Sequence, residues 1–174
     1  MAFSIDWRGA PLLAGLVACS PALDWRDVRV DSDALVAQFP CRPERRIREV
    51  AVAGAAVRME MVSCSTEGMT FGASHFAVAE PANVKAAMEG LKAAAVANLA
   101  GASPESTAFE LRGMTPNPSA ARLSVAGHLP GGEAVRLHSV FFSRGLRIYQ
   151  LSVLGAAPSN AIVDTFFAGM GFKG

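Results

Sequence analysis

The sequence has little net charge and no long uninterrupted hydrophobic segment. Its 174 residues carry a formal net charge of +1, from 16 lysines and arginines against 15 aspartates and glutamates. A nearly neutral chain lacks the basic surplus that binding to phosphate backbones requires, which argues against nucleic acid as a partner. No stretch reaches the roughly 18–20 apolar residues of a membrane-spanning helix, which excludes a polytopic membrane protein. However, 51% of the residues are hydrophobic, so the chain can bury a core and fold as one domain.

The sequence also lacks the motifs that mark common catalytic and cofactor sites. It has no Gly-x-Ser-x-Gly elbow, no phosphate-binding loop and no Cys-x-x-Cys. Of the three histidines, His75 shares a predicted strand face with Phe71 and Ala77 and is interpreted as structural. A hairpin turn at 130–132 places His128 opposite residue 134 or 135, so His128 and His138 do not form a metal site. We therefore expect no metal, no cofactor and no catalysis.

The first twenty residues carry a targeting pattern. Residues 9–18 are uncharged, Arg8 precedes them and Cys19 follows in the string Leu-Val-Ala-Cys, which is typical of a secretory signal. This string resembles the lipobox of bacterial lipoproteins. The resemblance implies cleavage before Cys19, lipid on its sulfur and a membrane anchor, with Ser20 favouring the outer membrane. The alternative is a buried N-terminal helix that ends in cysteine.

The cysteine count fits an exported protein. If lipid modifies Cys19, only Cys41 and Cys64 remain, and an oxidising compartment lets them pair. A turn at Gly54 would place residue 64 opposite about residue 44, within reach of Cys41. The alternative is two buried free thiols.

Hydrophobic periodicity predicts an α+β fold. Alternation through 57–62 indicates a half-buried strand, and an apolar stripe at steps of three and four indicates a helix over 81–100. A second helix begins at 158–159. Strands are predicted at 34–39, 47–53, 57–62, 69–79, 107–112, 122–129, 134–143 and 146–154. Tight turns join most strands, so we expect a mainly antiparallel sheet with both helices packed on it. We assign 1–18 to a signal peptide, 19–33 to a tether that runs into an edge strand, and 34–174 to a single domain.

The string Leu-Val-Ala-Gln-Phe-Pro-Cys-Arg-Pro at 35–43 resembles the opening of the Mog1/PsbP-like fold group. The order of elements over 24–172 is similar to that group, which implies a two- or three-layer arrangement of sheet and helices. The group's roles are docking and assembly, and no residue here carries those roles over. The whole chain also resembles small lipoproteins of Gram-negative bacteria.

Two surface features are candidates for partner binding. One is an arginine-rich segment of Arg42, Arg45, Arg46 and Arg48 interspersed with Glu44 and Glu49. It would contact lipid headgroups or an acidic partner, or else simply be a solvated edge. The other is a patch of Phe142, Val140 and Tyr149 across a hairpin. The predicted function is a non-enzymatic envelope lipoprotein that acts as an interaction or assembly module facing the periplasm and binds an unknown protein. The alternative is a small-ligand binder or cryptic enzyme with a pocket between helix 81–100 and the sheet.

Overall fold

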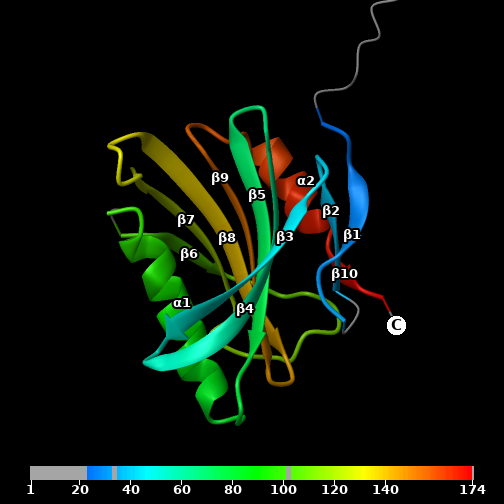
Figure 1. Cartoon of the computed structure of the whole chain (residues 1–174), viewed down its shortest axis with the longest axis vertical. Helices are drawn as coiled ribbons and strands as arrows, with labels where there is room; N and C mark the ends of the chain where they lie inside the picture. The colour runs from blue at the N-terminus through cyan, green and yellow to red at the C-terminus, as the bar shows by residue number, and fades with distance from the viewer. Residues whose placement is uncertain (1–22, 33–34, 101–102, 174) are drawn as a thin grey trace, which may run out of the picture.

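The structure, a computed structural model, describes residues 23–32, 35–100 and 103–173 (Figure 1). In chain order the elements are β1 (Arg26–Arg29), β2 (Leu35–Phe39), β3 (Glu44–Val52), β4 (Ala55–Thr66), β5 (Met69–Ala77), α1 (Asn83–Ala97), β6 (Glu105–Ala108), β7 (Ala121–His128), β8 (Ala134–Arg144), β9 (Arg147–Gly155), α2 (Asn160–Ala168) and β10 (Gly171–Phe172).

The centre of the fold is a seven-stranded antiparallel sheet in the order β3-β4-β5-β9-β8-β7-β6. Its hairpins turn where the sequence predicted, and Gly54 and Gly145 adopt the left-handed φ values of 82° and 58° that suit such turns. His128 pairs with Ala134, as the turn at 130–132 predicted. A separate three-stranded sheet has the order β1-β2-β10.

The two helices cover opposite faces of the large sheet. On one face, α1 contacts β8, β9 and β3. On the other face, α2 packs with the three-stranded sheet, because Phe166 of α2 meets both Phe71 of β5 and Phe39 of β2 at ring-centroid distances of 5.3 Å. Figure 1 shows α1 and the α2 layer on either side of the sheet. The α+β fold with a mainly antiparallel sheet is therefore confirmed, in a three-layer form.

The stripe predicted for the first helix is its buried face. Val84, Met88 and Leu91 are buried on α1, and Leu99 is buried just after it. Met88 is fully buried, while Lys85 points to solvent. The stripe therefore anchors α1 to the sheet through the hydrophobic effect.

Cys41 and Cys64 form a disulfide, as the sequence predicted. The β3–β4 register pairs Glu44 with Ser63, so Cys64 lies just beyond the last paired position. The Cα atoms of the two cysteines are 6.0 Å apart, within the usual range for a disulfide. The bridge closes the base of the β3–β4 hairpin.

Two segments differ from the prediction. The strand expected at 107–112 is β6, at Glu105–Ala108, because the chain then leaves the sheet edge and packs Phe109 against Phe142 at 5.7 Å. The edge strand expected at the end of the tether is β1. Val30 and Asp31 after it are buried, so the folded region includes residues that the sequence assigned to the tether.

The buried stripe of α1 leads to a stability prediction. Met88→Asp places an unpaired charge in the core and should lower the free energy of unfolding by several kcal/mol or unfold the domain. Lys85→Asp, on the exposed face of the same helix, is the matched control and should leave the melting temperature nearly unchanged. Equal melting temperatures for the two variants would contradict the packing of α1.

Candidate functional site

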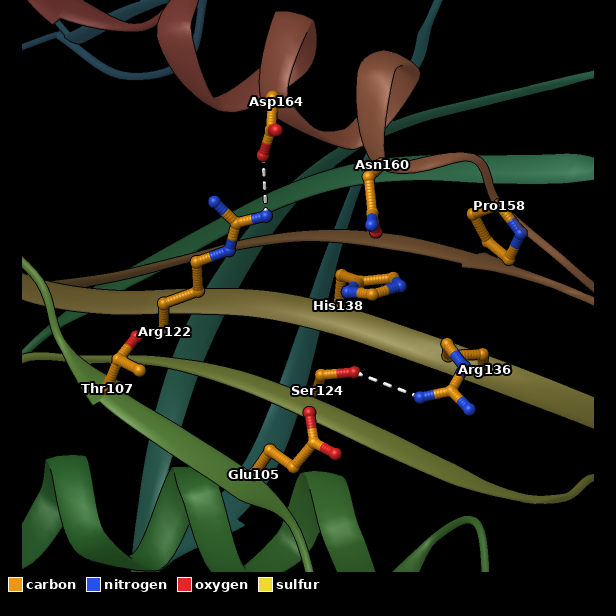
Figure 2. A pocket seen from close by; sticks show the side chains of 9 residues that line it. All are labelled: Glu105, Thr107, Arg122, Ser124, Arg136, His138, Pro158, Asn160 and Asp164. Atoms are coloured by element: carbon orange, nitrogen blue, oxygen red, sulfur yellow. Dashed lines mark hydrogen bonds and ion pairs between the residues drawn. The ribbon is translucent and has the colours of Figure 1, made fainter.

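The candidate site is a polar groove between α2 and the β6–β8 edge of the large sheet. It has a volume of about 590 Å³. Its lining residues, drawn in Figure 2, are Glu105, Thr107, Arg122, Ser124, Arg136, His138, Pro158, Asn160 and Asp164. Sheet residues form its floor, and the residues from 158 to 164 form its roof. A groove of this size suits a small-molecule ligand.

Strand register aligns a row of polar side chains across the floor. Glu105 of β6 pairs with Ser124 of β7, and Ser124 pairs with His138 of β8. Directly opposed residues point to the same face of a sheet, so a carboxylate, a hydroxyl and an imidazole lie side by side. The sequence predicted the β7–β8 register but not the pairing of β6 that completes this row.

His138 is the buried member of the row. The residue is only 6% exposed, and its Nε2 atom has no hydrogen-bond partner among the described residues. Burial lowers the pKa of His138 below its ordinary 6.5, and the positive charges of Arg122 and Arg136 lower the pKa further. Both effects favour the neutral form of the ring, and its buried Nε2 atom remains without a hydrogen-bond partner among the described residues.

The two arginines of the groove have different partners. Arg122 donates to Asp164 of α2 at 2.7 Å, and its guanidinium lies over the Phe167 ring at 5.2 Å. Arg136 donates to the Ser124 hydroxyl at 3.3 Å. Figure 2 shows the Arg122–Asp164 and Arg136–Ser124 hydrogen bonds, with His138 between Ser124 and Asn160. Arg122 is thus neutralised by an acid, and Arg136 is held by a neutral group.

The polar row does not have the order of a hydrolytic triad. A Ser-His-acid triad needs the imidazole between the hydroxyl and the carboxylate. Here the hydroxyl of Ser124 stands between Glu105 and His138, and its hydrogen bond comes from Arg136. Within the described residues, no group of three or more His, Cys, Asp or Glu side chains could hold a metal ion.

A second polar cluster lies deeper, where the small sheet meets the large one. The Asp31 side chain is fully buried and accepts hydrogen bonds from the Tyr149 hydroxyl, from Arg147 at 3.2 Å and from the Leu35 amide at 2.9 Å. Burial alone would raise the pKa of the Asp31 carboxyl, but these hydrogen bonds, that from Tyr149 foremost, hold the pKa below its ordinary value. The cluster therefore holds the small sheet against the large sheet.

His75 belongs to the same cluster, which supports its structural interpretation. It pairs with Tyr149 across β5 and β9 and lies 3.8 Å from the Glu60 carboxylate, measured from Nε2. Burial lowers the pKa of His75, although the negative charge of Asp31 acts in the opposite direction. His75 does not line the polar groove beneath α2.

The arginine-rich segment is exposed, as expected of a partner surface or a solvated edge. Arg42 precedes β3, and Arg45, Arg46 and Arg48 lie on β3 itself, the edge strand of the large sheet. Arg45 donates to the backbone carbonyls of Arg29 and Val30, and Arg46 pairs with Glu44 at 2.9 Å. Arg45 therefore also fastens the small sheet.

The expected surface patch of Phe142, Val140 and Tyr149 is wrong. All three are buried, and the Phe142 and Tyr149 rings stack at 5.1 Å. Alternation placed them on one sheet face correctly. However, Phe109 and Phe172, which are distant from these residues in sequence, pack on that face and cover it. The aromatic residues thus do not join the arginines in one surface.

The remaining predicted features are the lipid-bearing cysteine, a pocket between the first helix and the sheet, and the lack of a membrane-spanning helix. Cys19 lies outside the described residues. A cavity of about 420 Å³ lies between the start of α1 and the sheet, but alanines dominate its lining. None of the helices in the described part of the chain is long and apolar enough to cross a bilayer.

No protein-family model and no curated protein matches this sequence. The likeness to the Mog1/PsbP-like group therefore stays a prediction.

The buried Asp31 cluster predicts that substitutions at two aspartates have very different effects on the free energy of unfolding. Asp31→Asn weakens hydrogen bonds to a fully buried carboxylate and should cost about 1.5–3 kcal/mol of unfolding free energy. Asp27→Asn is the control, because Asp27 is exposed and pairs with Lys173 at the surface. Asp27→Asn should leave the urea midpoint nearly unchanged. Equal losses of unfolding free energy in the two variants would contradict the stabilising role of the Asp31 cluster.

The buried histidines predict acid sensitivity. The pKa values of His75 and His138 are lowered in the folded state, so below about 6.5 the unfolded chain binds more protons. Stability should therefore fall as pH drops from 7.5 to 5.5 in urea titrations. The double variant His75→Gln/His138→Gln should show a flatter profile than the parent protein. A parental slope in the double variant would contradict this origin of the acid sensitivity.

Proposed function

We propose that the protein is an exported, lipid-anchored domain of the bacterial cell envelope that acts by binding rather than by catalysis. In this proposal, Cys19 carries the lipid, the folded domain faces the periplasm, and Ser20 directs the protein to the outer membrane. The domain serves as an interaction or assembly module for a protein partner.

The observation that carries this proposal is the Cys41–Cys64 disulfide. Disulfides persist in oxidising compartments such as the periplasm and are rare in the cytosol. The bridge uses two of the three cysteines and leaves Cys19, the residue in the lipobox-like string, for lipid. The two features thus point to the same compartment.

The arginine-rich segment supports the interaction role. Its side chains are exposed on an edge strand, and the disulfide joins its start to β4. A segment that is held in place loses less conformational entropy when a partner binds. The arginine side chains suit acidic protein surfaces or anionic headgroups.

Fractionation of a Gram-negative host that expresses the full-length gene tests the anchor. The parent protein should fractionate with membranes, and mass spectrometry should show a mature chain that begins at lipid-modified Cys19. Cys19→Ala should move the protein to the soluble fraction, because about 0.8 kcal/mol per buried CH₂ is lost with the acyl chains. Ser20→Ala, which keeps the cysteine, is the control and should stay with membranes.

An intact Met1 on the native protein, or membrane association that persists in Cys19→Ala, would contradict the anchor. Pull-down of the lipidated protein from the same detergent-solubilised envelopes should recover a protein partner. Recovery of no partner would contradict the interaction role.

A further inference from the structure

We propose that the groove beneath α2 is a binding site for a small molecule that carries one carboxylate group. This inference goes beyond the envelope role, because it rests only on the residues of β6, β7, β8 and α2 and holds whether or not the chain is lipid-anchored.

The first support is the buried imidazole in the floor. His138 lines the groove of about 590 Å³ and is 6% exposed, and its buried Nε2 atom has no hydrogen-bond partner among the described residues. A buried polar atom without a hydrogen bond costs about 1–3 kcal/mol. A carboxylate oxygen that reaches the ring would remove that cost by accepting a hydrogen bond from it.

The second support is the charge that faces His138. Arg122 and Asp164 form an ion pair at 2.7 Å and cancel each other. Arg136 donates to the neutral Ser124 hydroxyl, which uses only one of the five N–H groups of its guanidinium. Arg136 is therefore the cation whose charge no acid of the groove pairs with directly, and a carboxylate is its natural partner.

The third support is the start of α2. Asn160 is the first residue of this nine-residue helix, and with Pro158 it forms part of the roof (Figure 2). The first N–H groups of a helix carry partial positive charge. This end of the helix therefore adds to the attraction that Arg136 exerts on an anion.

Glu105 limits the ligand to a single negative charge. It lies on β6, two strands from β8 and thus about 10 Å away along the hydrogen-bonding direction. Its carboxylate is exposed on the rim of the groove and repels a second anionic charge. This disfavours a doubly charged phosphate and favours a monoanionic carboxylate.

Nuclear magnetic resonance of the three histidine rings in the full-length chain tests the proposal. His138→Gln identifies the His138 signals by their loss. Sodium acetate, added at constant ionic strength with sodium chloride as the reference, should shift these signals saturably. It should also raise the pKa of His138, because a nearby anion stabilises the imidazolium form. Inorganic phosphate should produce a weaker response.

Arg136→Gln should weaken acetate binding about tenfold or more, since hydrogen bonds to charged groups contribute about 1.5–3 kcal/mol. Arg58→Gln, an exposed arginine on β4 outside both the groove and the arginine-rich segment, is the control and should bind as the parent does. Both sites are exposed, and equal melting temperatures will verify that both variants fold.

Three results would overturn the proposal: no saturable response to acetate, an unchanged affinity in Arg136→Gln, or phosphate that binds more tightly than acetate. A failed lipid-anchor experiment would leave this outcome untouched, because neither measurement depends on the other.

Discussion

The buried carboxylate of Asp31 is the constraint on which the arrangement of layers depends. A fully buried charge is tolerated only if its partners are in place, since the desolvation cost is otherwise uncompensated. Tyr149 and Arg147 come from the large sheet, whereas Asp31 follows β1. The small sheet and the large sheet therefore position each other, and both α2 and the groove roof follow from that placement.

Local chemistry allowed much of the fold to be predicted from the sequence. The hairpins at Gly54 and at 130–132 have their predicted registers, because turn residues and period-two alternation act over a few positions. The Cys41–Cys64 bridge follows directly from the first of these registers. The helix stripe at Val84, Met88 and Leu91 is predictable for the same reason, since a repeat of 3.6 residues has one buried face.

Long-range packing explains what the sequence did not reveal. Alternation put Phe142 and Tyr149 on the right face, but whether that face is exposed depends on Phe172, near the end of the chain. The groove also depends on long-range packing. His138 and Ser124 are neighbours through a predicted hairpin, whereas Glu105 and Asp164 line the groove only because β6 and α2 pack beside that hairpin. The β7–β8 register was the sequence signal for this groove, because the predicted turn at 130–132 already places residue 124 opposite residue 138.

The position of the disulfide has a mechanical consequence. Tension applied to the chain ahead of β1 first loads the small sheet, where β1 and β2 can separate one hydrogen-bonded pair after another. Beyond β2, the force reaches Cys41 and passes through the covalent bridge to Cys64 in β4. The β3–β4 hairpin lies inside the closed loop and carries almost none of the load. The arginine-bearing edge strand is thereby shielded from a pull on the N-terminal segment, whereas the groove roof, which depends on the small sheet, is exposed to it.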